Sequence, residues 1–154
     1  MNKSLTNFLF DFVGEKVISV LGLFYLLEGE KDIDDPQELQ INFSSGRSLK
    51  IYCSPDGASI CCESGYIVAR NLGDFGEEIV EDVSYMTPWE NLVGDQIIDV
   101  CVAKSSIEKA SIGIRLGFGK ENVSVLNLGD DLYVFEDVPE TIVRDQGLEF
   151  DCSV

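Results

Sequence analysis

The sequence predicts an α+β protein, mainly antiparallel β-sheet with two short helices, built from two pseudo-symmetric halves. Three observations predict it: an internal repeat, an apolar period of two after each short helix, and short turns between the apolar runs. A chain of 154 residues that is 45% hydrophobic suits one folded domain. We therefore expect a single domain over 1–154, with half-repeats at 4–70 and 87–154 and an acidic bridge at 71–86.

The repeat is clearest around two Val-Gly-acid blocks. Residues 12–20 read Phe-Val-Gly-Glu-Lys-Val-Ile-Ser-Val, and residues 92–100 read Leu-Val-Gly-Asp-Gln-Ile-Ile-Asp-Val. The offset between matching segments is 80 here and falls to 73 further along. The first half therefore carries about seven extra residues, around 28–37.

Each half is expected to open with a short helix. Leu5, Phe8, Leu9 and Phe12 have the spacing of one helical face, with Ser4 as a cap and a glycine at 14 as a stop. In the second half, residues 87–90 read Thr-Pro-Trp-Glu, the pattern of a capping box with proline at the first helical position. A glycine at 94 ends that helix.

After each helix the apolar residues alternate or run continuously, which predicts strands. In the first half these are 16–27, 39–43, 49–53 and 58–62, with turns at 44–47 and 54–57. In the second half they are 112–118, 123–128 and 132–135, with turns at 119–122 and 129–131. A further strand is expected after each block, at 66–70 and 141–144. Connections this short favour an antiparallel sheet.

The charge and the missing histidine exclude many functions. The chain has 28 acidic and 11 basic residues, a net charge of −17, and no histidine. A surface this negative repels phosphate backbones, so we expect no direct contact with nucleic acid. Without histidine there is no Ser-His-Asp triad, no Cys-His pair and no His-ligated zinc.

Cysteine usage and hydropathy predict a soluble cytoplasmic protein. The five cysteines include no CxxC pair and stand mostly in apolar runs, so we expect free thiols packed as small hydrophobic residues in a reducing compartment. No signal peptide pattern opens the sequence. The longest apolar run, 20–27, is far shorter than the roughly 20 residues of a membrane helix, so no membrane contact is expected.

No motif predicts a catalytic residue, a metal or a cofactor. Residues 32–35, Asp-Ile-Asp-Asp, match only the first positions of a calcium loop. The Cys61-Cys62 pair lacks an activating base. A hydrolase that depends on two carboxylates remains a third hypothesis, which would require a concave site with two acids of separated pKa.

Three acidic segments remain, at 28–38, 74–82 and 130–140. Each alone is typical of a solvated loop, but together they give a small domain a large negative field, which attracts a basic partner. Tyr85 and Trp89 follow the second segment. Aromatic residues of this kind are enriched at interface hot spots, whereas a packing role for Trp89 is the alternative.

A small acidic chain without a catalytic motif, with repeated Val13-Gly14-Glu15-x-x-Ile18 and Val93-Gly94-Asp95-x-x-Ile98 blocks, resembles the immunity proteins of bacterial polymorphic toxin systems, above all those of contact-dependent growth inhibition. The resemblance implies a monomer that binds a cognate basic toxin domain, such as an RNase or DNase, and occludes its active site. It carries no family binding residues onto this chain.

The expected binding residues therefore come from the acidic segments and their aromatic neighbours. They are Asp74, Glu77, Glu78, Glu81, Asp82, Tyr85 and Trp89, then Glu28, Glu30, Asp32, Asp34 and Asp35 in the insertion. The rival hypothesis is a structural or assembly module of a bacterial complex that uses its sheet edges.

Overall fold

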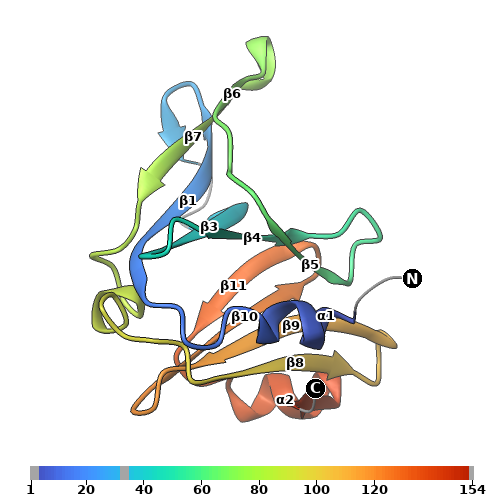
Figure 1. Cartoon of the computed structure of the whole chain (residues 1–154). Helices are drawn as coiled ribbons and strands as arrows, with labels where there is room; N and C mark the ends of the chain where they lie inside the picture. Colours follow the sequence, from blue (N-terminus) through green and yellow to red (C-terminus); the bar gives the residue numbers. More distant parts are fainter. Residues whose placement is uncertain (1–3, 32–34, 153–154) are drawn as a thin grey trace.

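Two antiparallel sheets form the protein, which a computed structural model describes over residues 4–31 and 35–152 (Figure 1). The first sheet has the order β5-β4-β3-β1-β7-β6, with β2 added to β1, and the second has the order β11-β10-β9-β8-β12. Every strand pair is antiparallel. The expected fold class is confirmed.

The first half and the expected bridge together contribute α1 (Leu5–Phe10), β1 (Val17–Leu27), β2 (Glu30–Lys31), β3 (Glu38–Phe43), β4 (Ser48–Cys53), β5 (Ile60–Ser64), β6 (Arg70–Asn71), the 3-10 turn η1 (Gly73–Phe75) and β7 (Glu77–Asp82). The second half contributes the 3-10 turn η2 (Trp89–Asn91), β8 (Asp99–Ser105), β9 (Ala110–Gly117), β10 (Asn122–Leu128), β11 (Asp131–Phe135), α2 (Glu140–Gln146) and β12 (Leu148–Asp151).

The main core lies between the two sheets. Helix α1 begins as expected, because the Ser4 hydroxyl accepts a hydrogen bond from the Asn7 amide at 3.2 Å. Its apolar face then buries Leu9, and Phe12 follows it into the core. Apolar residues from β1, β3, β4, β8, β9 and β10 fill the rest of this core, which explains their period of two.

The two Val-Gly-acid blocks meet at one point of the fold. The Gly14 amide donates to the Ile97 carbonyl at 2.7 Å, and the Gly94 amide donates to the Val17 carbonyl at 2.8 Å. Both glycines have positive φ, +91° and +95°, which side-chain-bearing residues rarely adopt. The order β1-β3-β4-β5 in one sheet also corresponds to β8-β9-β10-β11 in the other. A two-fold relation between the whole halves stays a prediction, which these paired bonds support.

Three local predictions are wrong. Residues 89–91 form one 3-10 turn instead of a helix, although the Thr87 hydroxyl does donate to the Glu90 carboxylate at 2.8 Å. Residues 141–144 lie in α2 rather than in a strand, and α2 ends at Gly147 with φ +57°. Of the predicted strand 66–70, only Arg70 is in β6.

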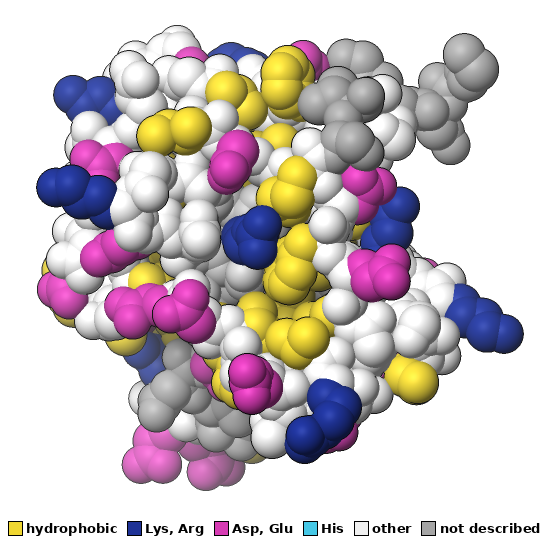
Figure 2. Space-filling view, turned by 90° about the horizontal axis from the view of Figure 1, so that it is seen from below, with side chains coloured by type: hydrophobic (Ala, Val, Ile, Leu, Met, Phe, Trp, Pro, Cys, Tyr) yellow, Lys and Arg dark blue, Asp and Glu magenta, His cyan; other side chains and the backbone are white. Residues whose placement is uncertain are grey.

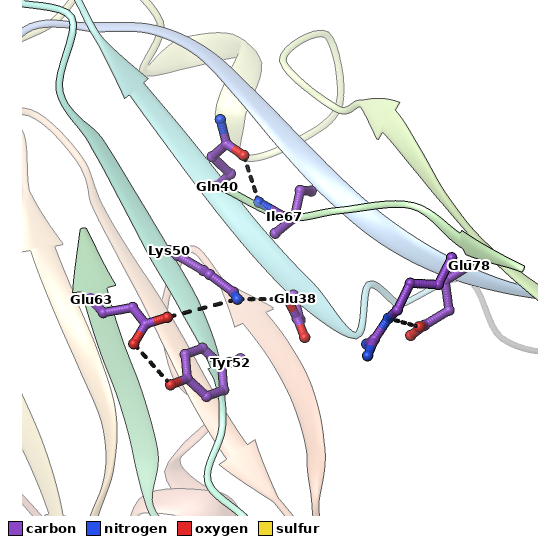
Figure 3. A network of polar contacts seen from close by, with 8 residues as sticks. Glu38, Gln40, Lys50, Tyr52, Glu63, Ile67 and Glu78 are labelled. Atoms are coloured by element: carbon purple, nitrogen blue, oxygen red, sulfur yellow. Dashed lines mark hydrogen bonds and ion pairs between the residues drawn. The ribbon is translucent and has the colours of Figure 1, made fainter. Parts of the chain in front are cut away.

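A strap of extended chain, residues 65–69, leads from β5 to β6 across the first sheet. The Ile67 amide donates to the side-chain oxygen of Gln40 on β3 at 2.8 Å, and Ile67 is buried (Figure 3). The Gln40 amide group in turn donates to Asn42 at 2.8 Å. These bonds hold the strap on the sheet, so the chain reaches β6 in a fixed position.

Helix α2 covers the outer face of the second sheet and forms a smaller core there. Ile112, Leu126 and Leu148 are buried in it, and Ile142 packs against them from α2. Beside this core, Cys101 on β8 and Cys152 after β12 form a disulfide. The expectation that all five cysteines are free thiols is therefore wrong, and cysteine usage no longer supports a reducing compartment.

Candidate partner-binding surface

Residues 24–31 and 70–82 form an arm that extends the first sheet beyond the two-sheet body (Figure 1). Strand β1 runs into it and pairs with β7, with Tyr25 opposite Glu78. At the tip, the Tyr25 hydroxyl donates to the Phe75 carbonyl. Gly76 allows this contact, because a Cβ there would overlap the Leu26 carbonyl. The arm is thus tied at both its base and its tip.

The arm brings together two acidic segments that are far apart in the sequence. The arm contains seven carboxylates and only two cations, Lys31 and Arg70. Lys31 pairs with Glu81 at 2.7 Å, and both side chains are one-third exposed. The exposed carboxylates without an ion pair in the described residues are Glu28, Glu30, Asp74, Glu77 and Asp82. The arm therefore presents a net negative surface.

Glu78 does not belong to that surface. The residue is only 8% exposed, and its carboxylate forms an ion pair with the Arg70 Nε at 2.7 Å. Figure 3 labels Glu78 and marks its ion pair with a dashed line. Because Glu78 is buried, it is not placed to contact a partner as expected. Its pair with Arg70 instead holds β6 against β7.

Asp82 is exposed but also has a local role at the end of β7. Its carboxylate accepts hydrogen bonds from the Ser84 hydroxyl and the Ser84 amide, which hold its pKa below the ordinary value. The Ser84 hydroxyl also accepts from the Val20 amide at 2.8 Å. Asp82 thus carries its negative charge while it shapes the turn after β7.

Large apolar side chains are exposed among the acids of the arm. Phe75 at the tip is 77% exposed, and Leu27, Leu72 and Val80 are exposed as well. The sequence analysis searched for charged segments and therefore missed these four exposed apolar residues. Apolar groups within a ring of charges are typical of protein interfaces, where the apolar part gives affinity.

The two aromatic residues expected at the surface behave differently. Tyr85 is 72% exposed, next to the exposed Met86. Trp89 is 3% exposed and lies in the main core. The packing alternative for Trp89 is therefore the right one, and Trp89 is not a surface anchor.

A small hollow opens between the two sheets at residues 35–36. It has a volume of 130 Å³, and Phe24, Leu39 and Trp89 form part of its apolar wall, with Asp35 at one side. Asp35 is half-buried. Asp32 and Asp34, also expected in the binding surface, lie outside the described residues.

A second hollow of 230 Å³ shares Pro36 with the first and is lined by acids from both sheets. Glu38 comes from β3, whereas Asp130 lies in the turn between β10 and β11 and Asp131 begins β11. Burial, and then the charges of Asp130 and Asp131, raise the pKa of the Cys53 thiol to about 12. The sequence analysis assigned 129–131 to a turn that opens an acidic segment, but it did not place these acids beside Glu38, which lies some ninety positions away in the sequence.

The open face of the first sheet carries its own polar network (Figure 3). Lys50 lies 3.6 Å from the Glu38 carboxylate and 3.7 Å from that of Glu63, and the Tyr52 hydroxyl donates to Glu63 at 3.2 Å. Burial, and then Glu63, raise the pKa of Tyr52 to about 12, so Tyr52 keeps its proton and acts as a hydrogen-bond donor. The network thus neutralises the lysine of this face.

Within residues 4–31 and 35–152, no three His, Cys, Asp or Glu side chains come together in a group that could hold a metal ion. In the same part of the chain, no helix has the length and hydropathy needed to cross a membrane. Comparison with known protein families, curated proteins and solved structures finds no match to this chain.

Proposed function

We propose that this protein binds and neutralises a basic toxin domain, as an immunity protein of the contact-dependent growth inhibition type does. The observation that carries the proposal is the arm, where two distant acidic segments and four exposed apolar side chains share one surface. The chain's net charge of −17 adds a long-range field of the same sign. Such a field steers a cationic partner toward the surface and raises its association rate.

The arm suits a nuclease partner on chemical grounds. An RNase or DNase must hold phosphate groups, so its active-site cleft is lined with cations. The carboxylates of Glu77 and Asp74 would occupy the place of phosphates, while Phe75 at the tip would contact apolar surface in the cleft. Occlusion of the active site then follows without any chemistry by this chain, and we propose no catalytic residue and no cofactor.

The experiment uses two triple charge reversals that change the net charge equally. The arm variant carries Glu30→Lys, Asp74→Lys and Glu77→Lys. The control carries reversals at three exposed acids outside the arm, Glu108, Glu121 and Glu149. Each is used as bait at low salt with extract of the native bacterium, captured proteins are identified by mass spectrometry, and the candidate toxin is then purified for titration.

The expected result is a basic toxin fragment that wild type and the control bind alike, and that the arm variant binds at least tenfold more weakly. Co-expression with the toxin should then rescue growth only for wild type and control. Equal weakening by both triples would mean that total charge, and not the arm, governs binding. Unchanged binding by the arm variant would overturn the arm as the site.

The exposed apolar tip gives a second, charge-neutral test. Phe75→Ala should weaken toxin binding by about 1–2 kcal/mol, the range of an aromatic interface residue. Ile107, 64% exposed in the turn between β8 and β9, supplies the matched control, and Ile107→Ala should leave binding unchanged.

We also propose that the protein works in the cytoplasm, where a delivered nuclease acts. A reducing cytoplasm would keep Cys101 and Cys152 as thiols. Alkylation in intact cells before lysis measures their oxidation state. Full alkylation of both residues agrees with a cytoplasmic protein, whereas a protected disulfide in fresh cells argues for an oxidising compartment.

An assembly module is the second candidate, and the free edge of β7 favours it. Strand β6 pairs only with Glu77 and Glu78, so in the described residues no strand covers β7 from Ile79 to Asp82. An open edge can add a strand from another chain. Light scattering after size exclusion separates the two: a monomer fits the inhibitor, and a stable oligomer fits the module.

A further inference from the structure

The outer edge of β7 is paired over only part of its length. Strand β6 pairs with β7 at Glu77 and Glu78. On the N-terminal side of Arg70 the chain leaves this edge and crosses the first sheet as the strap (Figure 1). Among the described residues, no strand lies on the outer side of β7 from Ile79 to Asp82. We call this stretch the open edge.

The hydrogen bonds at the two ends of β7 show which of its backbone groups point outward. Directly after β7, the Val83 amide donates to the Val20 carbonyl of β1 at 2.9 Å. Directly before β7, the Gly76 carbonyl accepts from the Leu72 amide at 2.8 Å, on the side of β6. Backbone groups of successive residues in an antiparallel strand point to opposite sides. The odd-numbered residues of β7 therefore bond toward β1, and the even-numbered residues point outward.

Val80 and Asp82 thus turn their amide and carbonyl groups to the open edge. Within the described residues, none of these four groups has a hydrogen-bond partner. A row of unpaired backbone groups is a template for pairing with an extended segment of another chain. The Val80 side chain is 37% exposed and gives such a segment an apolar contact.

The acids of the open edge disfavour a second copy of this chain as that segment. An antiparallel pair of two open edges would bring Glu81 and Asp82 of one copy close to the same acids of the other. Like charges opposite each other destabilise a strand pair. The net charge of −17 on each copy adds repulsion at longer range.

Charge complementarity instead favours a basic segment. The open edge lies in the arm, where seven carboxylates are accompanied by only two cations, and one of these, Lys31, already pairs with Glu81 at 2.7 Å. The side of the molecule on which α2 lies is different, because Figure 2 shows Lys and Arg side chains there among acidic and apolar ones. A cationic segment is therefore attracted to the arm, where few cations oppose it.

We propose that the toxin domain of the proposed function, on which this inference rests, is held by strand addition: an extended basic segment of the toxin pairs with the open edge of β7. Its main chain exchanges hydrogen bonds with Val80 and Asp82. Its Lys and Arg side chains lie among the acids of the arm. In this mode of recognition the main-chain bonds give affinity and the side chains give specificity.

The first test measures amide hydrogen exchange by NMR in the free chain and in the complex with the captured toxin. We expect the Val80 and Asp82 amides to exchange at least tenfold more slowly in the complex. The Ser64 amide supplies the control on β5, the opposite edge of the same sheet. It also points outward, because the Ser54 amide donates to the Ser59 carbonyl and the alternation continues along β5. Its exchange rate should not change.

A second test needs no toxin and uses a synthetic peptide, Lys-Val-Lys-Val-Lys-Val-Lys, with both ends blocked. The control is the same peptide with two adjacent central N–H groups methylated. Methylation leaves the side chains and the charge unchanged but blocks both edges of the strand. At low salt, calorimetry should show that the unmodified peptide binds at least tenfold more tightly than the methylated one.

Two variants of the chain extend both tests. Val80→Pro removes an outward N–H, a change that edge strands tolerate, and Ser64→Pro removes the matched group on β5. Val80→Pro should weaken the toxin and the peptide at least tenfold, whereas Ser64→Pro should change neither. Exchange of the Glu81 amide, which bonds toward β1, reports whether β7 stays paired in Val80→Pro.

Three outcomes would overturn strand addition. Unprotected Val80 and Asp82 amides in a stable toxin complex would do so while leaving the proposed function intact. Equal affinities of the peptide and its methylated control would mean that charge alone attracts it. A dimer of the free chain with both amides protected would place a second copy on the open edge. Failure to capture any toxin would instead contradict the proposed function, and the peptide comparison would still decide whether the edge adds a basic strand.

Discussion

Replacing Arg70 by methionine should destabilise the arm more than replacing its partner Glu78 by glutamine. The two side chains form a pair at 2.7 Å in which Glu78 is 9% exposed and Arg70 is 58% exposed. Arg70→Met leaves a buried carboxylate without its cation. Removing one partner of a fully buried ion pair lowers the free energy of unfolding by about 3–5 kcal/mol, and an ion pair at the surface contributes about 0.2–1 kcal/mol. With one partner in water, we expect about 1–3 kcal/mol.

The reverse substitution removes the charge from the buried side. Glu78→Gln leaves a neutral amide in the same space and an arginine that water can solvate, so we expect a cost of about 1 kcal/mol or less. The double variant should then be more stable than Arg70→Met alone, because it no longer buries an unpaired charge. This order follows from the unequal exposure of the two side chains.

Hydrogen exchange of the β7 amides measures the stability of the arm, and urea unfolding followed by Trp89 fluorescence measures that of the whole chain. Trp89 is the single tryptophan and is buried in the core, so its signal reports global unfolding. Equal effects of the two single variants, or costs below about 0.5 kcal/mol for both, would refute the reasoning. So would a double variant less stable than Arg70→Met.

Three further predictions concern single groups. The pKa of Asp56 is lowered, first of all because its carboxylate accepts a hydrogen bond from the Ser59 hydroxyl. The ionised carboxylate therefore stabilises the fold fully above the ordinary Asp pKa of about 3.9. This stabilisation is lost as the pH falls through the lower pKa of the folded state. Urea unfolding between pH 2 and 5 should show a weaker pH dependence for Asp56→Asn. Gly14→Ala and Gly94→Ala should each lower the free energy of unfolding in urea by about 1–2 kcal/mol, because φ is positive at both positions. No atom lies within 4 Å of the added Cβ, so this cost comes from the backbone conformation alone. Gly65→Ala should cost less, because φ is not positive there. Cys53, with a pKa of about 12, should react with a thiol reagent far more slowly at pH 8 in the folded chain than in urea.

Much of the fold could be predicted because its signals are local. The hairpins β3-β4 and β4-β5 join neighbouring apolar runs through short turns, so period and turn residues suffice to place them. The predicted helix at 87–90 failed for a reason that the capping pattern does not contain. Trp89 and Leu92 both enter the core, and the chain turns at Gly94 directly afterwards, so only one turn fits between them.

The candidate sites could be predicted only in part because they depend on distant pairing. The segments 28–31 and 74–82 were recognised as acidic, but nothing in the sequence says that both lie along β1. Cys101 and Cys152 meet only because α2 reverses the chain and returns β12 to β8. Because a strand was expected at 141–144, the sequence analysis did not predict this reversal.

The arm lies outside the strands whose order corresponds between the two sheets. From β1 to β5 and from β8 to β11 the strand orders correspond, and the facing sides of these strands form the shared core. Beyond that common part, the first sheet adds β2 and the β6–η1–β7 segment, which form the arm with the end of β1, and the strap leads to it. The second half adds α2 and β12, which form the smaller core on the outer face of the second sheet. Because residues that fill a shared core are constrained by packing, a fold has most freedom to acquire binding groups in the segments that lie outside that core.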